Sequence, residues 1–150
     1  MKIPRVLGIA GLVLAFLAGV VATFAVYETF FAPNVITYLN EPFPVVRDVV
    51  MPGESLEVLV EQCTRDTLNN NPLIYTFTRE LVAVDSNARY YLPQGTGSSM
   101  PGCQTFVQSG FLIIPDVPPG MYYLRGATLA RGQYKTTITD WQTVIFEISG

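Results

Sequence analysis

The chain has 150 residues, which is room for one folded domain of about 110 residues beside a hydrophobic N-terminal segment, but not for a second globular domain. It carries 9 basic and 12 acidic residues, so its net charge is -3. Such an acidic chain argues against a nucleic-acid partner, which selects basic surfaces. The sequence contains no histidine. It therefore lacks the commonest near-neutral acid–base group and metal ligand, which weakens most hydrolase and metalloenzyme schemes.

Residues 6–27 are predicted to form one transmembrane helix, preceded by a short cytoplasmic tail at residues 1–5. The segment VLGIAGLVLAFLAGVVATFAVY has no charged residue, and at ~1.5 Å per residue a helix of this length spans a hydrocarbon core of about 30 Å. Lys2 and Arg5 place the N-terminus in the cytoplasm by the positive-inside rule. The rest of the chain then faces the periplasm or the cell exterior.

A cleavable signal peptide is the alternative interpretation of this segment, because small residues near its end offer possible cleavage sites. Both interpretations export the same domain. We expect a retained signal anchor, because the apolar run is longer than the about 7 to 15 residues of a typical signal core.

Small residues recur at every fourth position of the predicted helix, at Gly11, Ala15, Gly19 and Thr23. This pattern lets transmembrane helices approach closely, so it predicts helix pairing in the membrane. Small residues are common throughout the segment, and chance spacing is the alternative explanation.

Residues 28–44 are expected to be a tether with one short strand, and residues 45–150 an all-β domain. The run LEVLVEQC alternates apolar with polar residues, as a strand with one solvated face does. Similar runs rich in β-branched and aromatic residues follow, namely LIYTFTRELVAVD, ARYYLP, TFVQSGFLII, MYYLRGATLA and WQTVIFEI. Turn signals at short intervals predict an antiparallel two-sheet β-sandwich of about seven strands.

The stretch GFLIIPDVPPGMYYLRG joins an apolar strand to a tyrosine-rich strand through two prolines and a glycine. Pro119 and Gly120 fit the centre of a type II turn. The stretch resembles transthyretin-like, or carboxypeptidase-regulatory-like, domains and the B-type repeats of collagen adhesins, and Tyr122 resembles the corner tyrosine of immunoglobulin-like (Ig-like) domains. The resemblance implies an extracytoplasmic sandwich without an active site. The lysine–asparagine cross-link of the adhesin repeats is not expected, because Lys135 is the only exported lysine and comes late in the chain.

Cys63 and Cys103 are predicted to form a disulfide in an oxidising compartment, with two buried free thiols as the alternative. Both cysteines adjoin polar, turn-rich stretches at residues 64–72 and 94–102. We expect these stretches to be loops that the disulfide ties together, and they are the first candidates for a functional surface.

A second candidate surface consists of aromatic residues that are common in protein interfaces, namely Tyr90, Tyr91, Tyr123 and Trp141. Strand alternation predicts that one tyrosine of each adjacent pair faces solvent. Ordinary packing between the sheets is the alternative explanation for these side chains.

Metal and catalytic sites are weakly supported. Three methionines and two cysteines could ligate copper(I), although core packing and a disulfide explain them better; they are Met51, Met100, Met121, Cys63 and Cys103. Asp85, Ser86 and Asn87 offer oxygen ligands but lack the further carboxylate of a calcium loop. Ser98 and Ser99 have no histidine to activate them. We expect no cofactor and no enzyme activity.

These features together predict a non-enzymatic, membrane-anchored extracytoplasmic β-sandwich. It would act as a structural or accessory interaction subunit of an envelope, secretion or virion-membrane assembly. Its expected partners are the membrane, through a single span, and other membrane or envelope proteins, with no nucleic acid and no small-molecule substrate. A tethered or secreted module that binds carbohydrate or another surface ligand is the main alternative, and a copper chaperone is a further one.

Overall fold

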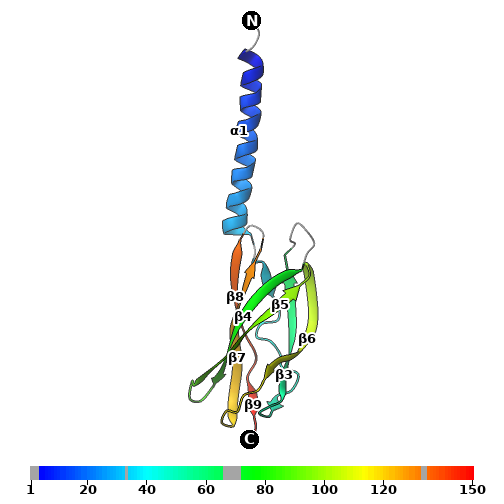
Figure 1. Ribbon diagram of the computed structural model, residues 1–150, viewed down its shortest axis with the longest axis vertical. Helices are drawn as coiled ribbons and strands as arrows, with labels where there is room; N and C mark the ends of the chain where they lie inside the picture. The colour runs from blue at the N-terminus through cyan, green and yellow to red at the C-terminus, as the bar shows by residue number, and fades with distance from the viewer. Residues whose placement is uncertain (1–3, 33, 66–71, 133–134) are drawn as a thin grey trace. The chain divides into compact units, whose positions relative to one another are not determined.

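The computed structural model describes residues 4–32, 34–65, 72–132 and 135–150. The chain divides into two units, Met1–Pro33 and Asn34–Gly150, which are described separately below (Figure 1). The first unit is helical. The second contains all the described strands.

The N-terminal unit is a single apolar helix. It consists of α1 (Pro4–Val26), which continues into the π-helical turn η1 (Tyr27–Phe31). The helix ends there because Ala32, which precedes Pro33, adopts an extended conformation (φ -63°, ψ 143°), as residues before proline do. Within Gly8–Phe31, an 18-residue stretch has a mean hydropathy of 2.5, and in the described part of the chain this is the one helix long and apolar enough to cross a membrane. The predicted apolar helix is confirmed, and its properties suit a membrane anchor or a signal sequence.

The second unit contains two sheets. The three-stranded sheet is antiparallel, with the strand order β1 (Ile36–Tyr38), β3 (Ser55–Thr64), β6 (Gly102–Ile113). The six-stranded sheet has the order β2 (Val49–Val50), β9 (Phe146–Ile148), β7 (Gly120–Arg131), β4 (Leu73–Ala83), β5 (Arg89–Ser99), and β8 (Thr136–Gln142) also pairs with β7. The prediction of a mainly β domain in two sheets is confirmed.

One strand pair differs from the antiparallel prediction, because β2 and β9 run parallel. The parallel direction begins earlier, at the bridge between Phe43 and Thr143. Two segments about a hundred residues apart in the chain thus run side by side in the same direction. No local sequence pattern specifies such a pairing. In the folded chain, the pairing buries Val50 and Ile148 almost completely.

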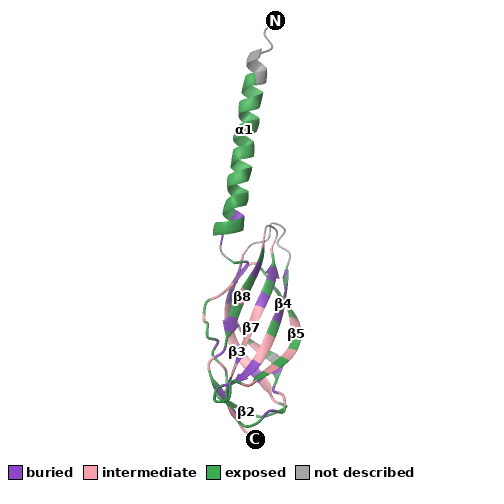
Figure 2. Ribbon diagram, turned by 90° about the vertical axis from the view of Figure 1, so that its left-hand side faces the viewer, coloured by how far each residue is buried: buried purple, intermediate pink, exposed green. Residues whose placement is uncertain are grey.

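Both sheets contribute to one main hydrophobic core. Strand β3 alternates buried and half-buried residues along its whole length, and buried residues alternate with more exposed ones along β4, β7 and β8 (Figure 2). The core contains residues of both sheets, including Val58, Val60, Leu81, Leu112, Leu124 and Phe146. Burying one such side chain contributes about 1.5–3 kcal/mol. A smaller apolar cluster lies around Ile36, Tyr75 and Phe77.

The folded unit begins earlier than the expected boundary at residue 45. Residues 34–44, which we predicted to be part of a tether, include β1 and the side chains of Ile36 and Phe43, which are 0% and 2% exposed. Asn40 is hydrogen-bonded to the backbone of Leu59 and Glu61. The prolines of this segment suggested a linker, but its apolar side chains complete the core.

The glycine-rich stretch at residues 94–102 is mostly strand, not loop. Strand β5 extends to Ser99, and β6 starts at Gly102. Gly95 and Gly97 lie beneath the rings of Phe77 and Tyr75, and a Cβ atom on Gly97 would lie only 2.5 Å from Cζ of Tyr75. These glycines therefore serve close packing within the sheet rather than a turn. In the other predicted loop, 64–72, Thr64 ends β3, and residues 66–71 lie outside the described residues.

The Pro-Pro-Gly corner between β6 and β7 contains the expected tyrosine contact. The hydroxyl of Tyr122 donates to the carbonyl of Pro118 at 2.6 Å, and Tyr122 is 2% exposed. This bond ties the start of β7 to the preceding turn. The expected type II turn is wrong, because φ of Gly120 is 157°, far from the value of about 80° that this turn needs.

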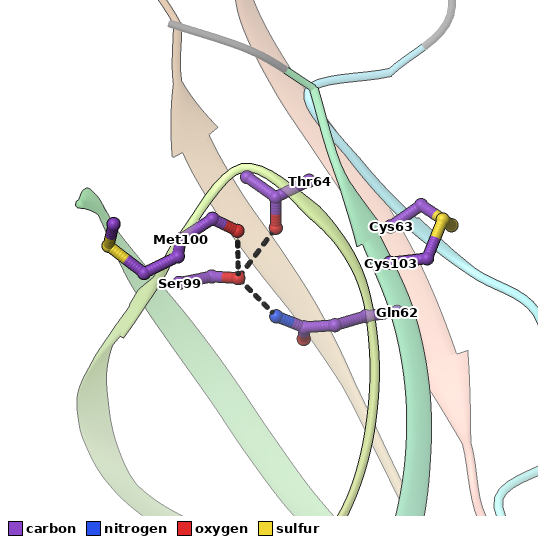
Figure 3. Close-up of a disulfide and its surroundings, with 6 residues drawn as sticks. All are labelled: Gln62, Cys63, Thr64, Ser99, Met100 and Cys103. Atoms are coloured by element: carbon purple, nitrogen blue, oxygen red, sulfur yellow. Dashed lines mark hydrogen bonds between the residues drawn. A yellow bond between two sulfur atoms is a disulfide. The ribbon is translucent and has the colours of Figure 1, made fainter. Parts of the chain in front are cut away.

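The predicted disulfide is present and joins neighbouring strands of the same sheet. Cys63 of β3 and Cys103 of β6 are direct register partners, with a Cα–Cα distance of 4.0 Å. The core side of β3, opposite the disulfide, carries a buried polar cluster (Figure 3). There the hydroxyl of Ser99 lies 2.8 Å from Nε2 of Gln62 and 2.6 Å from Oγ1 of Thr64. Ser99 ends β5, so the cluster links the two sheets where the chain crosses between them.

A second buried polar contact links the sheets near the middle of the core. The Tyr38 hydroxyl of β1 and Oγ1 of Thr128 in β7 are 2.7 Å apart. The indole of Trp141 also donates to Oγ1 of Thr128, at 3.1 Å. Burial raises the pKa of Tyr38 to about 12, although the bond to Thr128 acts in the opposite direction.

We expect the variant Cys63→Ser/Cys103→Ser to remain folded but to lose stability. The bond closes a loop across 40 residues, and removing such a bond costs about 2–4 kcal/mol. The fold persists because the β3–β6 pairing extends well beyond the cysteines. Urea unfolding of the protein with and without reductant measures the difference, and the variant serves as a control that reductant leaves unchanged. Equal midpoints for the wild type and the variant would contradict the prediction.

We expect the domain to lose stability at alkaline pH because of its buried tyrosines. The folded-state pKa of Tyr38, about 12, lies above its ordinary value of 10.0, so the unfolded chain loses the proton first. The contribution is therefore complete below pH 10 and is lost as pH rises toward 12, with a slope of up to about 1.4 kcal/mol per pH unit. Burial also raises the pKa of Tyr75 and of Tyr122. Unfolding curves at several alkaline pH values test this, and Tyr38→Phe should show a shallower slope than the wild type.

Candidate functional site

A hollow on the second unit lies on the solvent-facing side of the six-stranded sheet. Its volume is about 570 Å³, within the range of roughly 300–1,000 Å³ that is usual for ligand sites. We call it the sheet cleft, and it is lined by Glu41, Thr78, Arg79, Glu80, Arg89, Tyr91, Arg125, Gly126, Ala127, Asp140, Trp141 and Gln142. Apart from Glu41, these residues come from β4, β5, β7 and β8.

Strand alternation explains why the cleft is polar. Along β7, Tyr122 and Leu124 are buried in the core, so Arg125, the residue after Leu124, points to the opposite face. The same alternation on β4 buries Leu81 and turns Glu80 outward. The register of four strands then determines which outward side chains meet.

A row of four register partners crosses the cleft. Tyr91 of β5 lies opposite Glu80 of β4, which lies opposite Arg125 of β7, which lies opposite Gln142 of β8. Nε of Arg125 donates to Oε1 of Glu80 in an ion pair, and this hydrogen bond raises the pKa of Arg125. The pair fixes two planar polar groups at the centre of the cleft, while the Tyr91 side chain beside them is 78% exposed.

The floor of the cleft depends on Gly126. A Cβ atom at this position would lie 2.5 Å from Cζ2 of Trp141 and would also collide with the carbonyl oxygen of Thr78. The absence of a side chain therefore lets the indole of Trp141 pack directly beneath the strand. Trp141 is 3% exposed and donates a hydrogen bond to Thr128, so the floor is closely packed.

The rim carries charges of both signs. Arg89, Glu41 and Asp140 are exposed. Arg79 is more constrained, since its Nη2 donates to the carbonyl of Pro93 at 2.9 Å and its guanidinium lies 5.1 Å from the ring centroid of Phe77. Burial lowers the pKa of Arg79. A ligand in the cleft would therefore meet donors and acceptors at defined positions, and an exposed aromatic ring.

The four aromatic residues of the predicted second surface lie in different parts of the structure. Tyr91 lines the cleft, and Tyr123 lies half-buried on the same face of the sheet. Tyr90 packs against the main core, with its ring centroid 6.3 Å from that of Tyr122. Trp141 is buried beneath the cleft. One tyrosine of the Tyr90–Tyr91 pair thus faces solvent, as alternation predicted, but the four aromatic residues do not form one exposed patch.

Sequence reasoning missed most of the cleft, including Arg79, Glu80, Arg89, Arg125, Gly126 and Asp140. The alternation on each strand marked some of these residues as outward-facing. Their convergence depends on the register between β4, β5, β7 and β8, which no local pattern provides.

The sulfur residues considered for copper(I) do not converge. Met51 precedes β3 and Met100 lies beside the far end of β3, next to Thr64, so about 30 Å of strand separates them. Cys63 and Cys103 are joined in the disulfide rather than present as thiolates. Residues 85–87 form an ordinary turn, in which the amide of Asn87 donates to the carbonyl of Ala83. In the described ranges, no group of three histidine, cysteine or acidic residues is placed to hold a metal ion.

The small residues predicted for helix pairing all lie on α1. A Cβ atom on Gly11 or Gly19 would meet nothing within 4 Å. The hydroxyl of Thr23 donates to the carbonyl of Gly19 at 2.8 Å, which satisfies it within the helix. Pairing with a second helix stays a prediction.

No protein-family model matches the chain, and no curated protein is similar to it. Similar solved structures include the alkylpurine DNA glycosylase AlkC of Pseudomonas fluorescens bound to DNA containing an abasic site analog, at 14% identity and a TM-score of 0.45, over 79% of this chain and 32% of that chain. A ceramidase complexed with C2 has 16% identity and a TM-score of 0.43 over 81% and 21% of the two chains. The sporulation control protein Spo0M of Bacillus subtilis has 14% identity and a TM-score of 0.37 over 77% and 49%. The chain spans less than half the length of each, and at these TM-scores the likenesses support neither a family nor an activity.

Proposed function

We propose that the protein is a non-enzymatic, single-span membrane protein whose β-domain lies outside the cytoplasm and binds a partner protein through the sheet cleft. On this proposal the two sheets form an Ig-like or transthyretin-like sandwich. The protein serves as a structural or accessory subunit of an envelope, secretion or virion-membrane assembly.

Two features support the extracytoplasmic location. The apolar helix follows Lys2 and Arg5, which favour a cytoplasmic N-terminus. The disulfide between Cys63 and Cys103 suits an oxidising compartment. The helix is long enough to serve as a retained anchor.

The set of residues that line the cleft is the main evidence for a binding role. It combines the Arg125–Glu80 ion pair, a closely packed floor at Gly126 and an exposed Tyr91. Tyrosine and arginine are enriched among the residues that dominate protein interfaces, and charges of both signs give specificity. The described residues that line the cleft include no cysteine, serine, histidine or lysine, so binding suits this site better than catalysis.

Carbohydrate is the second candidate ligand. The exposed ring of Tyr91 offers a flat apolar surface beside the planar polar groups of Arg89 and Gln142. A sugar ring presents an apolar face and hydroxyl groups that would suit such a combination.

We expect the mature protein to retain residues 6–27 and to expose its β-domain outside the cytoplasm. Intact mass measurement of the protein extracted from membranes tests the first point. Protease treatment of right-side-out membrane vesicles tests the second, with inverted vesicles as the matched control. A mature chain that lacks the apolar segment, or a domain digested only in inverted vesicles, would contradict this placement.

We expect Tyr91→Ala and Arg89→Glu to reduce partner binding at least tenfold, because both side chains lie exposed at the cleft. Arg131→Glu is the matched control, since this arginine is exposed at the end of β7 and does not line the cleft. Quantitative mass spectrometry of proteins co-purified with the full-length chain gives the ratio, and a glycan array tests the second candidate. If all three variants retained partners equally, the cleft would not be the binding site, which would contradict the proposal. If the protein bound a glycan and this binding depended on Tyr91, the ligand of the cleft would be carbohydrate instead of a protein.

A further inference from the structure

The outer edge of β6 is a long strand edge that no other described strand covers. β6 pairs with β3 along one side, and no strand in the described residues pairs with its other side. Figure 1 shows this strand at the margin of the domain. The regular part of its pairing runs from Gly102 to Gln108, where the register shifts.

The hydrogen bonds of β3 show which backbone groups of β6 are open. On the side of β3 away from β6, the carbonyls of Glu57 and Glu61 accept bonds from Val46 and Leu39, and the amide of Leu59 donates to Pro44. In an antiparallel ladder, successive residues direct their N–H and C=O groups to opposite sides. The even-numbered residues of β3 therefore bond to β6.

The register then divides β6 into two sets of residues. Gln104, Phe106 and Gln108 lie opposite even-numbered residues of β3 and complete the ladder. Thr105 and Val107 lie between them, so their N–H and C=O groups point to the open edge. The Cα–Cα distance of 4.0 Å at the disulfide agrees with this assignment, since register partners without mutual hydrogen bonds lie about 4.5 Å apart.

The other strand edges are shorter or carry features that block pairing. Strand β5 contains Arg89 and Pro93, and β8 contains Asp140. Strands β1 and β2 have three and two residues. Natural proteins use charge, proline and short length to keep strand edges from pairing. The 12 residues of β6 contain neither a charged residue nor a proline, so this edge is open to strand addition.

The side chains along this edge suggest what an added strand would cover. Phe106 is half-buried and packs against the main core from the inner side. Val107 on the outer side is 51% exposed. An added strand with apolar residues on its inner side would extend the core over Phe106.

The charges near the edge suggest the rest of the partner's chemistry. Glu57 and Glu61 face outward on β3, one strand away from the neutral β6. A basic side chain on the outer side of an added strand would lie about 10 Å from β3 and would approach these carboxylates across Thr105. A second copy of the same strand pair would instead bring its own Glu57 and Glu61 to this face and add no basic residue.

We propose that the β6 edge between Cys103 and Gln108 binds an extended segment of a partner protein by β-strand addition, with apolar side chains toward the core and basic side chains toward solvent. Backbone hydrogen bonds to Thr105 and Val107 supply the pairing. This surface belongs to the three-stranded sheet and is separate from the sheet cleft. The proposal of strand addition is therefore independent of the proposal that the cleft binds a partner protein.

The test uses the full-length chain in detergent micelles and a synthetic acetylated and amidated heptapeptide of alternating valine and lysine. We expect at least tenfold slower hydrogen exchange at the amides of Thr105 and Val107 when the peptide is saturating. A peptide N-methylated on the amides of one edge should lose binding, because it cannot donate the pairing bonds. A peptide with glutamate in place of lysine should bind at least fivefold more weakly, as measured by fluorescence anisotropy.

Variants at Val107 locate the site. Val107→Pro removes an amide that faces the open edge and no bond to β3, so we expect a folded protein that no longer binds the peptide. Val107→Thr keeps the amide and is the matched control. If circular dichroism shows that the proline variant is unfolded, Val107→Lys provides the test, since its charge should weaken binding of the lysine peptide at least fivefold.

Three results would overturn the proposal. The first is equal affinity for the N-methylated and unmethylated peptides, and the second is equal binding by folded Val107→Pro or Val107→Lys and the wild type. The third is protection of the Thr105 and Val107 amides in the free protein that grows with protein concentration. That result would show that a second copy of the chain occupies the edge.

Discussion

The alternation of side chains along β7 is the constraint on which both the core and the sheet cleft depend. Leu124 points into the shared core, and its neighbour Arg125 points into the cleft. A shift of one residue in the pairing with β4 would exchange them and bury the guanidinium. Hydrophobic burial therefore fixes the register, and the register in turn places Glu80 and Gln142 on either side of Arg125. The cleft is a consequence of the same pairing that forms the core.

Buried hydrogen bonds add specificity to this apolar packing. The clusters around Ser99 and Thr128 each connect side chains from different sheets. A buried hydroxyl without a hydrogen-bond partner would lower the stability of the fold by about 1–3 kcal/mol. These groups therefore favour the one arrangement in which both sheets supply partners. Apolar surfaces alone could slide past each other, whereas Gln62 and Tyr38 each require a specific neighbour across the core.

Local sequence patterns predicted those elements that depend on local chemistry. The uncharged N-terminal run indicated the apolar helix, and the alternation in LEVLVEQC indicated the buried face of β3. Gly95 and Gly97 were misleading, because glycine signals a turn in sequence but here accommodates the aromatic rings of β4. Phe43 was assigned to a tether because prolines flank it, yet its side chain fills the core. The predicted turn at Gly120 failed for a related reason, since the strand that follows begins at the glycine itself.

The cleft was beyond local prediction because its residues become neighbours only through strand register. The same holds for the disulfide: counting cysteines predicted the pair, but only the β3–β6 register places Cys63 directly opposite Cys103. The position of the disulfide also affects the open edge of β6. A covalent link at the start of the edge holds β3 in place, so an incoming strand cannot displace it there and has to pair on the free side. The disulfide thereby favours addition of a strand to the sheet over exchange of one strand for another.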